Sequence, residues 1–301
     1  MKVTVRNLCA WLLAHVLIVS GFVRRSIKRA MRGEYILSVY FHNPTKHEFE
    51  SCVKWLIKKK FQFLSTNDLD CIIQQGLSFP KGSVLLTVDD GWQSNEANIV
   101  EVANRYGVPV TIFVSTAPVE EGTYWWSYVK KNVVNDIRNN TSKKLLKNIP
   151  NKERLLRVEE LKKTIFLKRD ALTVDQVKCI ADSKYITIGG HTHTHPILIN
   201  CSDEEVYSEL QLSKQKLEFW IGKEVKYFAY PNGDYSKREI QVLKELNYHF
   251  AFSTNPIYLT PDLLKEKYIL PRFAYLEGAS FAENICRITG VWKTFTQKFN
   301  F

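Results

Sequence analysis

The sequence is short of several features that would place it in a familiar class at once. Its six cysteines, spread over 301 residues, include no C-x-x-C pair of the kind found in redox sites and zinc fingers. Disulfide-stabilised domains are usually small and dense in cysteine, so we expect unpaired thiols in a reducing compartment. Internal repeats and low-complexity segments are also absent from the sequence, which argues against a repeat array.

A long hydrophobic run is missing as well. The main apolar stretch, residues 8–23, is interrupted by His15, Ser20 and Gly21, and it is shorter than the roughly 20 residues that cross a bilayer. No small-x-small cleavage site precedes the basic run, so a cleaved signal peptide is not expected. The basic residues that follow the stretch are Arg24, Arg25, Lys28, Arg29 and Arg32.

This N-terminal segment, residues 1–32, is nevertheless expected to associate with a membrane. A signal anchor fits the pattern, and so does a helix lying in the interface with its basic end on anionic headgroups; an ordinary buried helix is the alternative. Only Lys2 and Arg6 precede the apolar stretch, and by the positive-inside rule this asymmetry keeps the main body cytoplasmic. We therefore expect a location at the bacterial inner membrane, with the cytoplasmic face favoured.

Acidic residues are outnumbered by basic ones. The sequence has 42 Lys and Arg against 31 Asp and Glu, a net charge of +11, which suits an anionic polymer or an anionic membrane. Neither zinc-finger spacing nor an RNA-binding aromatic signature accompanies this charge, so nucleic acid is not an expected partner. With 45% hydrophobic and 24% charged residues, the composition is typical of a globular protein.

Beyond residue 33, short apolar runs alternate with segments of helical periodicity. The predicted strands are residues 35–40, 83–88, 110–114, 185–188, 226–230, 250–252 and 269–274. Capping boxes begin three of the intervening helices, at Thr173, Ser202 and Ser236. The alternation predicts the α/β class with a mostly parallel sheet, and we favour a distorted (β/α)7-type barrel over an open sheet. Functional groups should then lie at the carboxyl ends of the strands.

Residues 117–170 break this alternation and are too long for an ordinary connection between a strand and a helix. They contain Trp125-Trp126 and a helical stretch rich in Lys, Asn, Arg and Glu. We predict a helical insertion at about 117–170, near the mouth of a site, within a domain of residues 33–301. A solvated helical pair with no role in substrate binding is the alternative.

Two short motifs follow predicted strands and carry side chains that bind metals. Asp89-Asp90-Gly91 comes after the strand at 83–88, and His191 and His195 come after the strand at 185–188. Each motif alone is weak, because Asp-Gly commonly marks a turn and a histidine cluster can be a polar turn with one satisfied core histidine. Together they can supply a carboxylate and two imidazoles to a divalent metal, and a second carboxylate as a base.

These motifs resemble those of a known family, the polysaccharide deacetylases or NodB-homology carbohydrate esterases. Residues 87–91, TVDDG, are similar to the family's TFDDG motif, and residues 191–195, HTHTH, match its H-[ST]-x-x-H motif. Residues 228–233, FAYPNG, look like the third motif, R-x-P-Y-G, with Ala in place of Arg. The three occur in the family's order, and the resemblance covers about residues 34–275.

The resemblance implies a metal-dependent hydrolase built on a distorted (β/α) barrel. Asp90, His191 and His195 would hold the metal, usually zinc, and Asp89 would be the general base for a water that attacks the N-acetyl carbonyl. The backbone N–H of Asn232 would help to hold the oxyanion. The products would be acetate and a free amino sugar. The expected partners are therefore an N-acetylated glycan of a surface polysaccharide or a lipid-linked sugar, together with a membrane surface.

Two departures from the family pattern concern catalytic groups. The arginine that orients the base in relatives is missing from the third motif; Arg272, at a later predicted strand, could supply the guanidinium, and a surface or structural arginine is the alternative. The late Leu-x-His that supplies the acid is also absent, because no histidine follows His249, which itself begins a strand and lies at the wrong end. We predict His42 as the acid, since it resembles an early histidine of permuted relatives; a structural loop histidine is the alternative.

Aromatic residues near the motifs are candidates for binding a sugar, since rings offer apolar area at low entropic cost. We predict substrate contacts from Trp92, Trp125 and Trp126, and from Pro231 of the third motif; for the tryptophans, packing of the insertion onto the barrel is the alternative. Two other functions stay open, a catalytically idle carbohydrate-binding barrel and a deacylase of O-acetyl esters or other amides.

Overall fold

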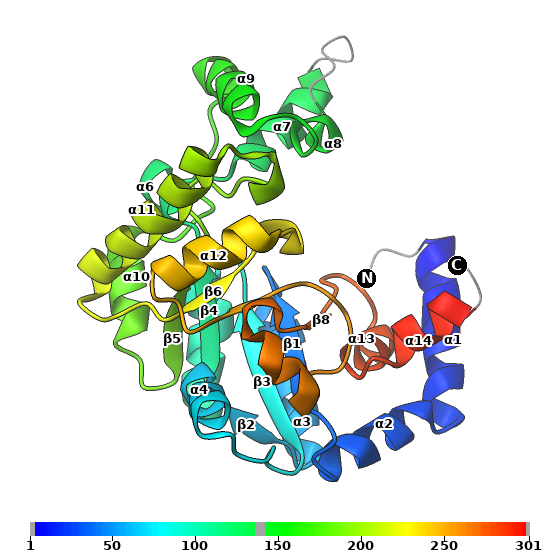
Figure 1. The fold of residues 1–301 in the computed structure, drawn as a ribbon. Coiled ribbons are helices and arrows are strands. Elements are labelled where there is room, and N and C mark those ends of the chain that lie inside the picture. Colours follow the sequence, from blue (N-terminus) through cyan, green and yellow to red (C-terminus); the bar gives the residue numbers. More distant parts are fainter. Residues whose placement is uncertain (1–3, 136–141, 299–301) are drawn as a thin grey trace.

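A computed structural model describes residues 4–135 and 142–298 of the chain. The described residues form a curled eight-stranded sheet in which every paired strand runs parallel to its neighbour (Figure 1). The strands are β1 (Leu37–Phe41), β2 (Gln62–Leu64), β3 (Ser83–Val88), β4 (Val110–Val114), β5 (Ile186–Gly190), β6 (Tyr227–Ala229), β7 (Phe250–Phe252) and β8 (Phe273–Ala274). Sequence analysis missed β2, which pairs with the start of β3, because it is Gln-Phe-Leu, begins with an exposed polar residue and is only half-buried, so no apolar run marks it.

The sheet curls until its two ends approach each other. The strand order is β7-β6-β5-β4-β3-β1-β8, yet Leu270, just before β8, forms a parallel bridge with Phe252 of β7. The N–H of Leu270 donates to the carbonyl of Ala251 at 2.9 Å, and the N–H of Ser253 donates to the carbonyl of Leu270 at 2.8 Å. Residues 270–274 therefore lie beside β7 at their start and beside β1 at their end, which confirms the predicted distorted (β/α)7-type barrel.

Alternation along the strands separates a surface that faces the helices from the barrel interior. In β3, the side chains at positions 84, 86 and 88 pack under the helices, whereas Leu85 packs inside with Phe113 and Phe252. Because successive side chains of a strand point to opposite faces, Thr87 and Asp89 belong to the inner face. The pleat of β3 thus directs the first aspartate of the DDG motif into the barrel.

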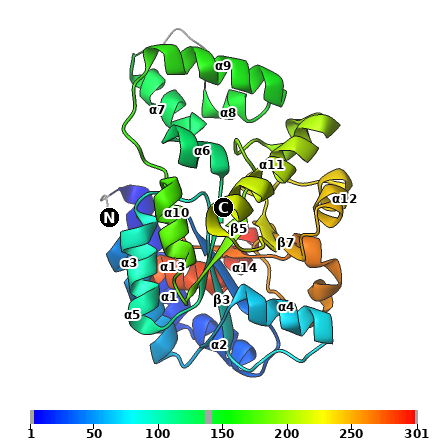
Figure 2. The same ribbon diagram turned by 90° about the vertical axis from the view of Figure 1, so that its left-hand side faces the viewer.

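Helices surround the sheet (Figures 1 and 2). They are α3 (Lys46–Lys58), α4 (Thr66–Gln75), α5 (Glu101–Tyr106) with a preceding π-helical segment η1 (Glu96–Val100), α10 (Val174–Ala181), α11 (Asp203–Ile221) and α12 (Lys237–Glu245), with three 3-10 segments, η2 (Leu198–Asn200), η3 (Pro231–Gly233) and η4 (Pro261–Ile269). The capping boxes predicted at Thr173, Ser202 and Ser236 are all formed.

Four helices follow β4 and stand above the carboxyl end of the barrel (Figures 1 and 2). They are α6 (Thr116–Glu121), α7 (Trp125–Asn135), α8 (Lys143–Leu146) and α9 (Asn151–Thr164). Arg154 of α9 ties this segment to the barrel, because its guanidinium donates to the hydroxyl of Thr194 at 2.9 Å. Residues 136–141 of the predicted insertion lie outside the described residues.

The N-terminal helices pack at the side of the barrel with the C-terminal ones (Figure 1). These helices are α1 (Val5–Val19), α2 (Phe22–Met31), α13 (Phe281–Ile288) and α14 (Val291–Lys298). Ala14 and Leu17 of α1 are buried in one cluster with Ile285 and Cys286 of α13. Among the described residues no single helix is long and apolar enough to cross a membrane, although α1 and α2, which meet at a bend of 58°, meet the length and composition criteria as a pair. Residues 1–3 of the predicted N-terminal segment (1–32) and residues 299–301 of the predicted domain (33–301) lie outside the described residues.

Candidate active site

Neighbouring strands deliver the predicted metal ligands to one end of the barrel. Asp89 and Asp90 come directly after β3, and His191 comes directly after β5, with β4 between the two strands. Because the strands are parallel, their carboxyl ends lie at the same edge of the sheet. His195 joins this group from the loop that follows His191.

Asp90, His191 and His195 form a buried cluster with the geometry of a metal site. The Oδ1 atom of Asp90 lies 3.4 Å from Nε2 of His191 and 3.2 Å from Nε2 of His195, and one ligand atom from each residue lies within 4.8 Å of the others. A tetrahedral zinc ion with bonds of ~2.0–2.2 Å needs ligand atoms about 3.4 Å apart. The cluster therefore fits a small divalent ion with little rearrangement.

Neighbouring groups fix the orientation of the ligands. His191 Nδ1 lies 2.7 Å from the carbonyl oxygen of Ala229, so this nitrogen must carry the hydrogen and Nε2 presents its lone pair to the cluster. The indole N–H of Trp92 donates to Oδ2 of Asp90 at 2.9 Å, which leaves Oδ1 facing the imidazoles. His195 Nδ1 is buried and has no hydrogen-bond partner among the described residues.

The protonation states of the cluster also suit a metal. Burial alone would raise the pKa of the Asp90 carboxyl, but hydrogen bonds with His191 and His195 outweigh it and hold that pKa well below its usual value. Burial lowers the pKa of His195 to about 4, against the opposing hydrogen bond with Asp90. An ionised carboxylate and a neutral imidazole are the forms that coordinate a metal ion.

The backbone around the cluster adopts uncommon conformations. Asp90, Thr192 and His195 have positive φ angles of 78°, 65° and 54°, which non-glycine residues rarely adopt unless surrounding contacts impose them. At Asp90 this conformation breaks the alternation of β3, so that its side chain joins the cluster instead of the helix-facing layer. The buried carboxylate of Glu209 holds the histidine loop, because it accepts the N–H groups of residues 193 and 194 at 2.8 and 2.7 Å.

Asp89 and Arg272 form a buried ion pair beside the cluster. Nη1 and Nη2 of Arg272 each donate to one oxygen of the Asp89 carboxylate, both at 2.7 Å. Nη1 also donates to the hydroxyl of Thr87 at 2.9 Å, and Nε donates to the carbonyl of Ser253 at 3.1 Å. The guanidinium lies 4.6 Å from the ring centroid of Tyr40. These contacts lock Arg272 inside the barrel, where it touches the residue predicted as the base.

The cluster and Asp89 line a cavity of about 500 Å³, which we call the site cavity. Of the predicted substrate contacts, Trp92, Trp125 and Trp126 line this cavity, as does Asn232, whose φ is positive at 59°. Pro231 is buried and is not part of the lining, and its predicted contact with substrate stays a prediction.

The tryptophans divide between two roles. Trp125 is buried and its indole N–H donates to the carbonyl of His195 at 3.0 Å, so it fastens the insertion to the histidine loop. Trp126 stacks on Tyr124 with ring centroids 4.6 Å apart, and its ring lies edge-on to His195 at 4.6 Å. Trp92 packs against Tyr124 on the same side, at 4.4 Å. Trp126 and Trp92 thus form an aromatic wall next to the metal cluster.

His42 lies on another wall of the site cavity, after β1. Its Nδ1 is 4.0 Å from Oε1 of Glu277, and the same carboxylate oxygen accepts the backbone N–H groups of His42 and Asn43 at 2.8 and 3.2 Å. Glu277 therefore fixes the loop that carries His42. A protonatable group and a carboxylate therefore stand together in the cavity that the metal cluster lines.

Two other histidines stay out of the cavity. The ring of His193 turns to the hydroxyl of Thr116, with Nδ1 at 2.7 Å, as expected for the middle residue of the histidine motif. His249 lies at the amino-terminal end of β7, where its Nδ1 is 2.6 Å from Oδ2 of Asp70. The expectation that His249 lies at the wrong end of the barrel is confirmed.

Sequence analysis missed three charged residues of the site cavity, Lys143, Lys147 and Glu277. The lysines come from α8 and its C-terminal end, and Lys147 Nζ donates to the side-chain carbonyl of Asn232. Burial lowers the pKa of Lys147, and Lys143 adds to this effect. No local pattern marks these residues, because their place depends on how the insertion folds back over the barrel.

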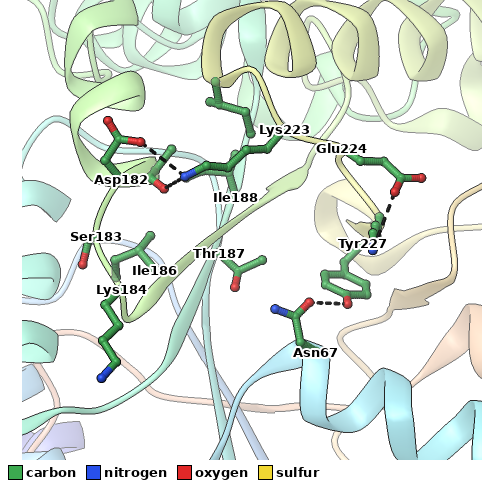
Figure 3. Close-up of a pocket in the computed structure, with 13 residues that line it drawn as sticks. Asn67, Asp182, Ser183, Lys184, Ile186, Thr187, Ile188, Lys223, Glu224 and Tyr227 are labelled. Atoms are coloured by element: carbon green, nitrogen blue, oxygen red, sulfur yellow. Dashed lines mark hydrogen bonds and ion pairs between the residues drawn. The ribbon is translucent and has the colours of Figure 1, made fainter.

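A second cavity, of about 510 Å³, lies at the amino-terminal ends of β5 and β6 (Figure 3). Its side chains engage one another: Tyr227 donates to Asn67 at 2.6 Å, and Lys223 pairs with Asp182 at 3.3 Å (Figure 3). The one group of metal-capable side chains found among the described residues lies at the opposite end of the strands. Because functional groups of parallel barrels collect at the carboxyl ends, this cavity is not the candidate active site.

A model of one protein family matches the chain. The family is described as polysaccharide deacetylase, and the match covers residues 77–251, which is 175 of the 301 residues. This range contains both the DDG motif after β3 and the histidine motif after β5.

Curated proteins and solved structures give matches of the same kind. YxkH of Bacillus subtilis (strain 168) is 23% identical over 211 residues, which are 70% of this chain and only 58% of that protein. The poly-β-1,6-N-acetyl-D-glucosamine N-deacetylase of Staphylococcus aureus (strain MRSA252) is 24% identical over 238 residues, 79% of this chain and 69% of that protein. The Streptococcus pyogenes deacetylase PplD, solved in complex with acetate, has a TM-score of 0.62 at 18% identity, and the match covers 85% of this chain and 97% of PplD. At this identity the structural match shows the fold.

Proposed function

Because this chain belongs to the polysaccharide deacetylase family, we propose that it is a metal-dependent hydrolase that removes N-acetyl groups from amino sugars of a glycan or glycolipid. One observation carries the proposal: Asp90, His191 and His195 line one cavity together with Asp89, which Arg272 holds in a buried ion pair. The name of the Staphylococcus relative gives an N-acetylated glucosamine polymer as its substrate, which supports this substrate class.

The cluster would hold the metal ion. Two imidazole nitrogens and one carboxylate oxygen favour zinc among the common divalent ions and leave a position open for a further ligand. When bound there, the ion would supply a Lewis acid and lower the pKa of a water molecule toward ~7. Trp92 and the carbonyl of Ala229 keep the ligands oriented for that ion.

Asp89 is proposed as the general base. Its carboxylate lines the same cavity as the cluster and is adjacent in the chain to the ligand Asp90. Arg272 occupies one lone-pair site on each oxygen of this carboxylate, and the remaining sites can accept a proton from water. The guanidinium thus positions the base without blocking it.

Two further groups are proposed to complete the reaction. Asn232 faces the cavity from a turn with positive φ, and its backbone N–H is the proposed donor to the oxyanion that forms from the acetyl carbonyl. His42, which lines the cavity beside Glu277, is the proposed acid that protonates the leaving amine. Trp126 is the proposed platform for the sugar ring, since one aromatic face can stack on an apolar sugar face.

An idle carbohydrate-binding barrel fits these observations less well. A site that only binds sugar needs neither a buried Asp-His-His cluster nor a second aspartate held by an arginine, and this chain has both. Hydrolysis of O-acetyl esters uses the same groups, so the substrate test includes both acetyl linkages.

The test measures acetate release from β-1,6-linked N-acetylglucosamine oligomers and, in a parallel assay, from an O-acetylated sugar. We expect release from the N-acetyl substrate, and Asp89→Asn should lower kcat by about 10²-fold or more. Asp175→Asn, the same substitution at a solvent-exposed aspartate of α10, is the matched control and should leave kcat unchanged. Acetate release from the O-acetyl sugar alone would assign an esterase, and release from neither would overturn the proposal.

A further inference from the structure

Helix α1 has an apolar face that no described part of the chain covers. Its inner side is packed, since Ala10, Ala14 and Leu17 are buried next to the C-terminal helices. Exposed apolar side chains recur every three or four residues on the other side, which places them on one stripe of the helix. These residues, which we call the α1 outer face, are Val5, Leu8, Leu12, Val16 and Val19. Val5 and Val19 are 81% and 86% exposed.

The surroundings of this face carry charge of one sign. Residues 1–33 contain seven Lys and Arg and no Asp or Glu. Three of the seven pair with acidic side chains elsewhere in the chain. Arg24, Arg25 and Lys28 of α2 are exposed and have no acidic partner within the described residues. An exposed apolar stripe on α1, followed in the chain by the exposed cations of α2, is complementary to a bilayer surface with anionic headgroups.

The packing of α1 favours a helix that lies on such a surface over one that crosses it. Fifteen residues at 1.5 Å each make a helix of about 22 Å, shorter than the hydrocarbon core of about 30 Å. The 58° bend at the junction with α2 ends the helix axis there. One side of α1 is also buried against α13 and α14, and Figure 1 shows these helices between α1 and the sheet.

A groove of about 1170 Å³ connects α1 with the site cavity. Asn43 and Glu277 line both the groove and the site cavity, so the two adjoin at these residues. At its other end the groove is lined by Trp11 of α1. We call it the α3 groove, because one side of α3 forms its wall.

The lining of the α3 groove suits a phosphate-bearing saccharide. His47, Ser51, Trp55 and Lys58 of α3 line it at intervals of three or four residues, a strip about 16 Å long. The site-cavity end of the strip is polar. The far end combines two indole rings with exposed lysine, and a strongly hydrated ammonium group on a flexible stem is a common ligand for phosphate.

We propose that the α1 outer face rests on an anionic membrane surface and that the α3 groove guides a lipid-linked, phosphate-bearing amino sugar from that surface into the site cavity. The lipid stays in the bilayer at α1, the saccharide follows α3 past Asn43, and the N-acetyl group reaches the metal cluster. The last step rests on the proposed function, whereas the membrane contact does not.

The membrane contact is tested with the full chain and vesicles of phosphatidylethanolamine and phosphatidylglycerol. Co-sedimentation should show binding to these vesicles and at least tenfold weaker binding to phosphatidylcholine vesicles. The variant Leu12→Glu/Val16→Glu should bind at least tenfold more weakly than the unmodified chain, with an unchanged thermal unfolding midpoint. Val5→Glu/Val19→Glu, at the two most exposed positions, is a second variant with the same expected loss.

Phe219→Glu is the matched control, because Phe219 is an exposed apolar residue on α11, 87% accessible, outside the α1 outer face. It should bind vesicles as the unmodified chain does. Equal vesicle binding by the α1 variants would overturn the membrane contact. A dimer in the absence of lipid that the α1 variants dissociate would assign the face to a second copy and would also overturn it.

The groove is tested by comparing kcat/KM for a lipid-linked N-acetylamino sugar in vesicles with kcat/KM for a soluble N-acetyl disaccharide. Ser51→Trp, which fills the middle of the groove, should lower the ratio of the two values at least tenfold. Ser208→Trp, at an exposed serine of α11, should leave the ratio unchanged. An unchanged ratio for Ser51→Trp would overturn the role of the groove. Acetate release from neither substrate would overturn the proposed function, and the groove's role with it, while vesicle binding would still decide the membrane contact.

Discussion

Arg272, which directly precedes β8, binds both carboxylate oxygens of Asp89 inside the barrel. The two residues are 183 positions apart, and both hydrogen bonds between them measure 2.7 Å. The motif position where relatives have arginine is Ala229, whose carbonyl instead orients the ring of His191. The segment before β8 therefore supplies the partner of the proposed base, while β6 keeps a role in orienting a metal ligand.

Breaking this ion pair should destabilise the fold. Arg272→Met and Asp89→Asn each leave a buried group without its partner, and we expect each to lower the free energy of unfolding by about 3–5 kcal/mol in urea titrations. The double variant should lose less than the sum of the single losses, by about 2 kcal/mol, because the unpaired charge is gone. Arg157→Met, at a half-exposed pair with Glu153, is the control and should cost less than about 1 kcal/mol. If the double variant loses as much free energy of unfolding as the two single variants together, the pairing of Asp89 with Arg272 is contradicted.

The aromatic wall makes a prediction about substrate affinity. Trp126→Ala should raise KM about tenfold and change kcat by less than about threefold, since a lost aromatic contact is worth about 1–1.5 kcal/mol. Steady-state kinetics on N-acetyl oligosaccharides measure both constants. Phe219→Ala, at an exposed ring away from the cavity, is the control and should change neither. A fall in kcat at constant KM would place Trp126 in the chemical step instead.

The proton donor can be identified by comparing variants of two residues that line the site cavity, His42 and Lys147. His42→Gln should lower kcat about 10²-fold with unchanged metal content, because the leaving amine loses its acid. Lys147→Met removes a cation that contacts Asn232, and we expect a higher KM as its main effect. Since burial lowers the pKa of Lys147, this lysine is the competing candidate for the acid. A larger fall in kcat for Lys147→Met, with loss of the alkaline limb of the pH profile, would assign the role to Lys147.

The metal-free protein should lose stability as the pH falls. Burial lowers the pKa of His195 to about 4, whereas a histidine in the unfolded chain titrates near 6.5. Between these values the unfolded chain binds more protons than the folded one, so the free energy of unfolding decreases from pH ~6.5 toward pH ~4. Urea titrations with a chelator present should show this decrease, and His195→Gln should flatten it. His15→Gln, at an exposed histidine, should leave the slope as it is, and a slope unaffected by His195→Gln would contradict the assignment.

The sequence predicted the parts of this protein that depend on local patterns. Short apolar runs gave seven of the strands, and the position of Asp89 and Asp90 after such a run predicted their place at the edge of the sheet. The strand β2 was missed because it begins with an exposed glutamine and is only half-buried, so it lacks the apolar run that marks the equally short β6 and β7.

The parts that could not be predicted depend on contacts between distant segments. Lys147 enters the site cavity only because α8 folds back over the barrel, and Glu277 binds the loop of His42 from the far end of the domain. Glu209 braces the histidine loop from the middle of α11, where the sequence shows only an ordinary helical glutamate. Such partners become visible only when the packing of the elements is known.

The central claim is that Asp90, His191 and His195 hold a divalent ion on which deacetylation depends. The most direct test measures bound metal and acetate release on the same preparations of the unmodified chain, Asp90→Ala and the control Asp175→Ala. The account predicts about one ion per chain and acetate release for the unmodified chain and the control, and a loss of both, by 10²-fold or more for activity, in Asp90→Ala. Acetate release near the unmodified level by a metal-free Asp90→Ala chain would contradict it.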